Sequence, residues 1–121
     1  MKLLVTGGLG FIGSNFILKL LTESSDYEII NVDAELFGAD HKNLSEIKNS
    51  KKYHFEKGNI TNKKFMEEQI ANCDAVINFA AETFVDRSIN DANPFLVSNI
   101  RGAYTILDII TEQKKRMIQI S

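Results

Sequence analysis

The sequence has few of the residues that stabilise secreted, metal-binding or membrane-spanning proteins. Its 121 residues include one cysteine, one proline and no tryptophan. A single cysteine excludes an intramolecular disulfide, and without a cluster of His and Cys residues we expect no metal site. No stretch approaches the roughly 18 apolar residues that suggest a membrane-spanning helix. Glycines interrupt the apolar N-terminus, which therefore does not resemble a signal peptide. We expect a cytoplasmic protein with no membrane partner.

The sequence also lacks a strong excess of either charge. Its 14 Lys and Arg residues and 16 Asp and Glu residues give a formal net charge of −2, which gives no sign of nucleic-acid binding. Hydrophobic residues make up 44% and charged residues 25% of the chain, as in ordinary globular domains. A chain of this length is expected to form one domain and can bury about two-thirds of its unfolded surface.

The most informative segment is the glycine-rich stretch of residues 5–13, Val-Thr-Gly-Gly-Leu-Gly-Phe-Ile-Gly. It fits G-x-G-x-x-G through Gly8, Gly10 and Gly13, and G-x-x-G-x-x-G through Gly7, Gly10 and Gly13. Glycine lets the backbone approach a pyrophosphate closely, and the free N–H groups of the following helical turn then face its charge. The segment therefore predicts a dinucleotide site. The alternative is that the glycines serve only a tight turn.

Asp33 ends the next apolar run, twenty residues after Gly13. An acid at this distance is expected to accept hydrogen bonds from the adenosine ribose hydroxyls of a dinucleotide. Its charge and that of Glu35 would repel a 2′-phosphate, and no Lys or Arg follows before Lys42. We therefore predict NAD rather than NADP as the cofactor. The alternative is an acid that only faces solvent after a strand.

Strand-like and helix-like segments alternate along the chain. The alternation predicts an α/β fold of the Rossmann-like three-layer type, with a parallel sheet of five strands in the order 3-2-1-4-5. The predicted strands are residues 2–6, 28–33, 53–57, 75–79 and 117–120. The predicted helices are residues 11–22, 62–71 and 94–113, with a possible short helix near 43–48. Thr61 or Asn62 is predicted to cap the second helix, and Asn93, before Pro94, the third.

Two further segments carry a family resemblance. Residues 78–89 read Asn-Phe-Ala-Ala-Glu-Thr-Phe-Val-Asp-Arg-Ser-Ile, and residues 98–102 read Ser-Asn-Ile-Arg-Gly. Together with residues 6–13, they resemble the extended short-chain dehydrogenase/reductase family, and within it the sugar-nucleotide 4,6-dehydratases. The resemblance covers the whole chain without large gaps. It implies that residues 1–121 are the N-terminal part of an NAD-binding Rossmann domain.

The resemblance implies specific cofactor contacts. Backbone N–H groups of residues 11 and 12 would meet the pyrophosphate, Asp33 the ribose, and Asn59 the adenine. Asn59 departs from the aspartate usual in the family, but its side-chain oxygen could still pair with adenine. Thr83 would also contact the substrate. The complete set of implied cofactor-binding residues is Gly7, Gly10, Phe11, Ile12, Gly13, Asp33, Ala34, Leu36, Asn59, Ile60, Phe79, Ala80, Ala81, Thr83 and Ser98.

Several of these residues have a simpler interpretation that stays open. Ala80 and Ala81 would also permit close packing, and Thr83 could be an ordinary loop residue. Asn99 could hold its helix against a neighbouring strand instead of contacting a ligand. Asp86 and Arg87, which we do not consider catalytic, could form an ion pair within the loop. Tyr104 and Phe95 are expected to pack against the rest of the fold.

The reacting groups of the family are not expected in this chain. Relatives continue strand five with Ser-Thr-Asp-Glu-x-Tyr-Gly, and Ser121 resembles the first residue of that motif. We identify no catalytic Tyr-x-x-x-Lys pair among Tyr27, Tyr53 and Tyr104, and so predict no catalytic residue. The resemblance implies an NAD-dependent lyase that acts on a nucleotide sugar, with dTDP-glucose expected, whereas the 121-residue chain alone would be inactive. An unpaired edge at the last strand predicts self-association or a homodimer.

Two other functions remain open at this point. One is a UDP-sugar 4-epimerase of the same family, which the Thr-Asp-Glu triplet would distinguish. The other is a non-catalytic module that binds or senses NAD.

Overall fold

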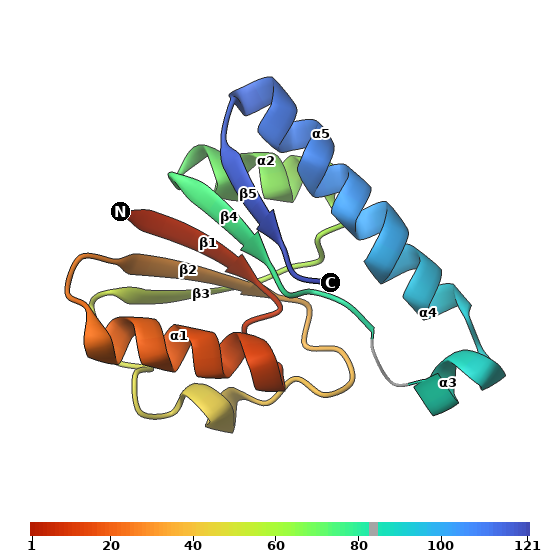
Figure 1. The fold of residues 1–121 in the computed structure, drawn as a ribbon, viewed down its shortest axis with the longest axis horizontal. Coiled ribbons are helices and arrows are strands. Elements are labelled where there is room, and N and C mark those ends of the chain that lie inside the picture. Colours follow the sequence, from red (N-terminus) through yellow and green to blue (C-terminus); the bar gives the residue numbers. More distant parts are fainter. Residues whose placement is uncertain (83–84) are drawn as a thin grey trace.

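The computed structural model describes residues 1–82 and 85–121. Its centre is a five-stranded parallel sheet in the order β3-β2-β1-β4-β5 (Figure 1), which confirms the predicted fold class. The strands are β1 (Lys2–Thr6), β2 (Glu28–Asp33), β3 (Tyr53–Lys57), β4 (Ala75–Asn78) and β5 (Arg116–Gln119). Each strand differs from its prediction by no more than one residue at either end. Strands β1, β2 and β4 were predictable because each contains a short apolar run followed by a helix or a turn.

Helices cover the two faces of the sheet (Figure 1). On one face lie α1 (Phe11–Glu23) and the 3₁₀ helix η1 (His41–Leu44), and on the other lie α2 (Lys63–Ala71) and α5 (Ala103–Gln113). Alternate residues of β1 enter two separate cores, since successive side chains of a strand point to opposite faces. Leu4 packs with residues of α2 and α5, whereas Val5 packs with Ile17 of α1. Right-handed crossovers between parallel strands produce this three-layer arrangement.

The long helix before β5 is less regular than predicted. It consists of α4 (Asn93–Leu96), a π-helical turn η2 (Val97–Gly102) and α5. The predicted cap is one residue out of place, because Ala92 precedes the helix and Asn93 is its first residue. The Asp91 carboxylate accepts the Asn93 N–H at 3.0 Å and so orders the start of the helix. A π turn inserts one extra residue and often occurs at functional sites.

Three smaller predictions have different outcomes. The cap of α2 is Asn62, whose side chain accepts the Phe65 N–H at 3.2 Å, as one of the two alternatives predicted. The short helix expected near residues 43–48 is instead η1, which begins earlier because Asp40 accepts the Lys42 N–H. Helix α3 (Val85–Asn90) was not predicted. The start of η1 therefore depends on a local side-chain cap.

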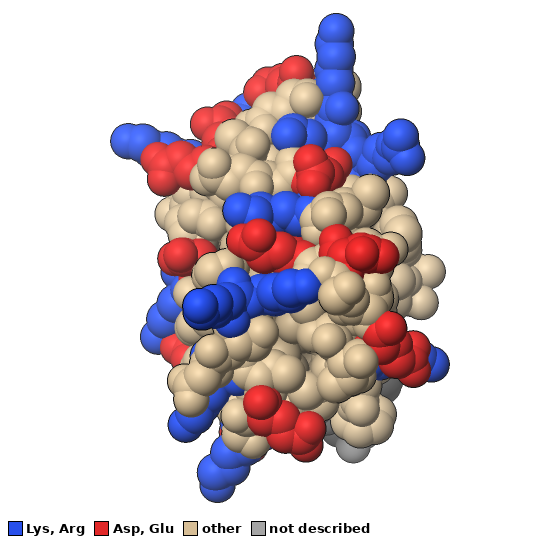
Figure 2. All heavy atoms as spheres, turned by 90° about the vertical axis from the view of Figure 1, so that its left-hand side faces the viewer, with Lys and Arg blue, Asp and Glu red and all other residues tan. Residues whose placement is uncertain are grey.

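Charges of both signs are mixed on the surface. On the face shown in Figure 2, Lys and Arg side chains alternate with Asp and Glu, and neither sign forms a continuous patch. This mixture agrees with the small net charge of −2. Among residues 1–82 and 85–121, the helices are too short or too polar to cross a bilayer.

Candidate dinucleotide site

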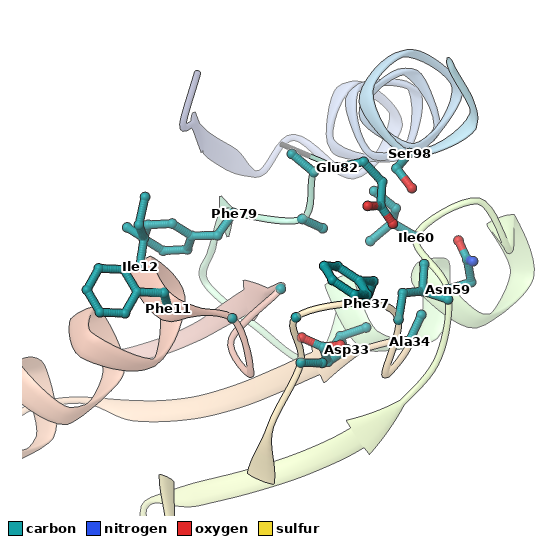
Figure 3. Close-up of a pocket in the computed structure, with 18 of the residues that line it drawn as sticks. Phe11, Ile12, Asp33, Ala34, Phe37, Asn59, Ile60, Phe79, Glu82 and Ser98 are labelled. Carbon is teal, nitrogen blue, oxygen red and sulfur yellow. The ribbon is translucent and has the colours of Figure 1, made fainter. Parts of the chain in front are cut away.

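A single cavity collects most of the predicted cofactor residues at the carboxyl ends of the strands. Its volume of about 420 Å³ is in the range of small-molecule sites. Figure 3 shows Phe11, Ile12 and Phe79 on one side of it, Asn59, Ile60, Glu82 and Ser98 on the other, and Asp33 and Phe37 between them. The predicted residues that line it are Gly7, Gly10, Phe11, Ile12, Asp33, Ala34, Leu36, Asn59, Ile60, Phe79, Ala80, Ala81 and Ser98.

Two predicted residues are not among those lining the cavity. Gly13 lies behind it, where a Cβ would come within 2.4 Å of the Gly7 carbonyl oxygen, so it lets α1 pack against the glycine-rich loop. Thr83 is outside the described residues. Its predicted contacts with cofactor and substrate therefore stay predictions.

The glycine-rich loop brings β1, β4 and α1 close together. Gly7 has φ +72°, and a Cβ there would lie 2.6 Å from the Ala80 nitrogen, so this position requires glycine on both counts. Gly10 is different, because the nearest atom to its Cβ would be at 3.5 Å, an ordinary contact. The fold therefore requires glycine at Gly7. At Gly10 the fold would admit a side chain, and the glycine instead keeps the cavity that it borders open.

The first turn of α1 is open to an anion. Gly10 precedes the helix and offers no side-chain cap, and the turn contains no acidic residue. The first N–H groups of a helix have no partner within it, and the helix dipole makes this end positive. Phe11 and Ile12 in this turn are 81% and 63% exposed, and both line the cavity. This geometry suits a pyrophosphate.

Asp33 holds the two loops that border the adenosine side. One carboxylate oxygen accepts the Leu9 N–H at 3.0 Å and the other accepts the Glu35 N–H at 2.8 Å. The residue is buried, but each carboxylate oxygen can accept more than one hydrogen bond. Asp33 can therefore position both loops and still accept hydrogen bonds from the hydroxyls of a ribose.

Asn59 is tied to its own turn. Its Oδ1 accepts hydrogen bonds from both the N–H and the hydroxyl of Thr61, at 3.0 and 2.9 Å. The sequence-based hypothesis placed this same oxygen against adenine. That contact would have to share the oxygen with Thr61, and it stays a prediction.

Asn99 joins the π turn to the loop after β4. Its Oδ1 accepts the Glu82 N–H at 2.8 Å, and its Nδ2 donates to the Glu82 carbonyl at 3.0 Å. Of the two roles left open for Asn99, the structure shows the one that holds the helix against the strand end. The contact fixes the backbone of Glu82, whose buried side chain lines the cavity beside Ser98.

Sequence reasoning missed several residues that line the cavity. They are Val32, Phe37, Gly38, Ala39, Gly58 and Glu82. Val32 and Gly58 are neighbours of predicted residues and could have been included on that ground. Phe37 and its neighbours lie in the loop after β2, which is a usual place for ligand contacts in such sheets. Glu82 could not be recognised without its tertiary contact to Asn99.

One Tyr-x-x-x-Lys spacing does occur in the chain and was not recognised in the sequence. Tyr53 and Lys57 have this spacing, but both lie on β3, where four residues span about 13 Å of extended backbone. The buried Tyr53 hydroxyl accepts a hydrogen bond from Asn31 at 2.9 Å, and burial raises its pKa. Lys57 instead contacts Glu35 at 2.7 Å. The two side chains therefore do not form a catalytic pair.

The position of Lys57 shows that the sequence-based prediction of no cation near Asp33 was incomplete. The sequence shows no cation between Asp33 and Lys42, but pairing of β2 with β3 places Asp33 opposite Lys57. Glu35 makes an ion pair with Lys57 and a contact with His41. The hydrogen bond from Lys57, followed by that from His41, lowers the pKa of the Glu35 carboxyl. Lys57 therefore brings a positive charge to this edge, but the Glu35 carboxylate neutralises it.

Known proteins are similar to this chain over nearly its whole length. A family model described as GDP-mannose 4,6 dehydratase matches residues 4–121. The low-salt glycan biosynthesis protein Agl12 of Haloferax volcanii is 39% identical over the whole chain, which covers 39% of that protein. The dTDP-glucose 4,6-dehydratase of Mycolicibacterium smegmatis is 38% identical, again over the whole chain, which covers 36% of the enzyme.

Solved structures of related enzymes also superpose on this chain. The dTDP-glucose 4,6-dehydratase of Bacillus anthracis, in complex with NAD, superposes with a TM-score of 0.89 and 35% identity, over 100% of this chain and 37% of that one. A UDP-glucose 4-epimerase of Thermotoga maritima is a weaker match, with a TM-score of 0.84 and 28% identity over 98% of this chain and 37% of that one. The chain spans a little over a third of the length of the curated relatives it matches. On these matches and this fold, the chain belongs to the GDP-mannose 4,6 dehydratase family.

Proposed function

We propose that residues 1–121 form an NAD-binding Rossmann domain that supplies the cofactor-binding part of a sugar-nucleotide 4,6-dehydratase. The observation that carries the proposal is the position of Asp33 between two loops at one side of a cavity whose other border is the uncapped start of α1. The acid suits a ribose and the helix start suits a pyrophosphate. A family relative binds NAD in its crystal structure.

The proposed reaction converts dTDP-glucose to dTDP-4-keto-6-deoxyglucose by loss of water. NAD supplies the chemistry, since it can take up a hydride and return it within one cycle, so that none is consumed. The described residues bind and orient the cofactor: Asp33 and the start of α1 hold its adenosine half, and the residues after β4 border the rest of the cavity. We propose that the reacting acid, base and tyrosine lie outside this chain, which alone is inactive.

Cofactor binding is tested by calorimetric titration of the 121-residue chain with NAD and, separately, with NADP. We expect NAD to bind and NADP to bind at least tenfold more weakly, because Asp33 repels a 2′-phosphate. A folded sample, checked by circular dichroism, that binds neither dinucleotide would contradict the proposal that these residues suffice for the cofactor site.

The epimerase and the non-catalytic module are separated by product analysis. A longer polypeptide that carries this chain and the rest of the relatives' length would be incubated with dTDP-glucose and, separately, with UDP-glucose. We expect a 4-keto-6-deoxy product from dTDP-glucose, detected by mass spectrometry as the loss of one water. Formation of UDP-galactose would indicate an epimerase. NAD binding without any product would support the non-catalytic module.

We further propose that the chain works in the cytoplasm and that it self-associates or forms a homodimer. Exposed apolar residues support the second point. Ile118 on β5 is 58% exposed, and on the helix before it Ile100 is 63% exposed. An apolar hollow beside α1 is lined by Phe16, Ile77 and Ile118, among others. Contiguous exposed apolar surface favours association, and sedimentation of a clean monomer at high concentration would contradict it.

A further inference from the structure

Glu35 occupies an unusual position beside the proposed ribose site. It has φ +57°, in the left-handed region that non-glycine residues seldom adopt. Its N–H is held by the Asp33 carboxylate at 2.8 Å, and its own carboxylate contacts both Lys57 and His41. Glycine would adopt this backbone at lower cost. A side chain kept under such strain, next to a binding site, is a reason to look for a function.

The contacts of Glu35 neutralise a cation on the strand next to Asp33. Lys57 lies opposite Asp33 in the β2–β3 register, and its nitrogen is 2.7 Å from a Glu35 oxygen. His41 contacts the other oxygen of the same carboxylate and packs edge-on against Phe55 at 4.8 Å between ring centres. If Glu35 had no charge, Lys57 and His41 would be available to a phosphate at this edge. Ala34, which Figure 3 shows beside Asp33 in the cavity, has no bulk or charge to prevent it.

We propose that Glu35 is a specificity-determining residue that excludes NADP by holding Lys57 and His41 away from a 2′-phosphate. The inference rests on the proposed NAD site. Its effect is distinct from that of Asp33, which accepts the ribose hydroxyls directly. With Glu35 present, the side chains of Asp33, Glu35 and Lys57 together carry a net charge of −1, and with a neutral residue in its place they carry none. The first arrangement repels a phosphate dianion and the second does not.

The matched control is at the other end of β2. Glu28 also contacts one lysine and one histidine, Lys2 at 3.1 Å and His54 at 3.0 Å. It lies at the amino end of the strand, away from the cavity. Glu28→Gln therefore removes the same charge and the same kinds of ion pair as Glu35→Gln. Glutamine keeps the size of the side chain in both variants.

The test is calorimetric titration of wild type, E35Q and E28Q with NAD and NADP, the weaker ligand being measured by competition. We expect E35Q to bind NADP roughly fivefold more tightly and NAD within about twofold of wild type. We expect E28Q to match wild type for both. In E35Q/K57M the gain for NADP should disappear, because the released lysine is gone. In E35Q the gain should shrink at high salt.

Three outcomes would overturn the inference. An unchanged NADP to NAD ratio in E35Q, while wild type binds NAD, would overturn it and leave the proposed function intact. An equal change in E28Q would show an effect of net charge alone. Failure of the folded wild-type chain to bind NAD would overturn the proposed function together with the inference.

Discussion

The two ends of β2 carry the same set of side chains in different surroundings. At the amino end, Glu28 contacts Lys2 and His54, and at the carboxyl end, Glu35 contacts Lys57 and His41. The hydrogen bond from the lysine is the first cause of the lowered pKa of each glutamate. Only the second set lies at the carboxyl end of the strand, next to Asp33 and Ala34, which line the cavity. Ligands of open parallel sheets bind beyond the carboxyl ends of the strands. An ion-pair pattern alone therefore says little about function until its place on the sheet is known.

The backbone conformation also differs between the two ends of β2. Glu28 is an ordinary strand residue, whereas Glu35 is held in the left-handed region by the Asp33 carboxylate. At the amino edge, the side-chain contacts of Glu28 add to the ladder hydrogen bonds of regular strands. The carboxyl edge depends on particular side chains, so substitutions there should have larger and more specific effects.

The largest expected effect is at the glycine-rich loop. Gly7→Ala combines a positive φ with a Cβ placed 2.6 Å from backbone, and should lower the free energy of unfolding by about 3 kcal/mol. Gly10→Ala meets no close atom and should change it by less than about 1 kcal/mol, yet weaken NAD binding, because its methyl group enters the cavity. Urea unfolding and calorimetry measure the two effects. A stable Gly7→Ala variant would show that the loop is not tightly constrained.

The next effect concerns the contact between Asn99 and Glu82. Asn99→Ala removes two hydrogen bonds to the Glu82 backbone and should lower the free energy of unfolding by about 1–3 kcal/mol. Asn72→Ala is the control near the amino edge, since Asn72 lies on the surface at the end of α2 and its side chain donates one hydrogen bond to the Glu68 carbonyl of that helix. We expect the control to lose less than about 1 kcal/mol. Equal losses in the two variants would remove the distinction between the edges.

The smallest effect is the response to acid, which should be alike at the two edges. The folded chain lowers the carboxyl pKa of Glu28 and Glu35 below the ordinary 4.5, so the unfolded chain binds protons more readily. The resulting stabilisation is present above the unfolded pKa and is lost as pH falls through the lowered folded value. E28Q and E35Q should each show a smaller loss of stability between about pH 5 and pH 3, measured by urea unfolding. A steeper loss in either variant would contradict the assigned direction.

Most of the fold could be predicted because its determinants are local. Short apolar runs identify the strands, and residues such as Asn62 identify a helix start. The π turn could not be predicted, because its residues have ordinary helix propensity and the turn accompanies the tertiary contact of Asn99 with Glu82. The contact of Asp91 with the Asn93 N–H was missed for a simpler reason, since Asn93 is itself a good capping residue and precedes Pro94.

The parts of the candidate site that depend on a single residue could be predicted from the sequence. Gly7 and Asp33 follow from motif and spacing alone. The ion pair of Glu35 with Lys57 could not be predicted, because it depends on which residues face one another across β2 and β3. Tyr53 and Lys57 have the spacing of a catalytic motif, but both lie on β3, so their spacing does not make them a catalytic pair.

The most direct test compares NAD binding by Asp33→Ala and Glu28→Ala. Both variants lose one carboxylate at an end of β2, and circular dichroism would confirm that both fold. Calorimetry should show NAD affinity reduced more than tenfold in Asp33→Ala, because hydrogen bonds to a charged group are worth about 1.5–3 kcal/mol each. Glu28→Ala should bind as wild type does. Equal affinity in the two variants would contradict the placement of the NAD site at the carboxyl end of β2.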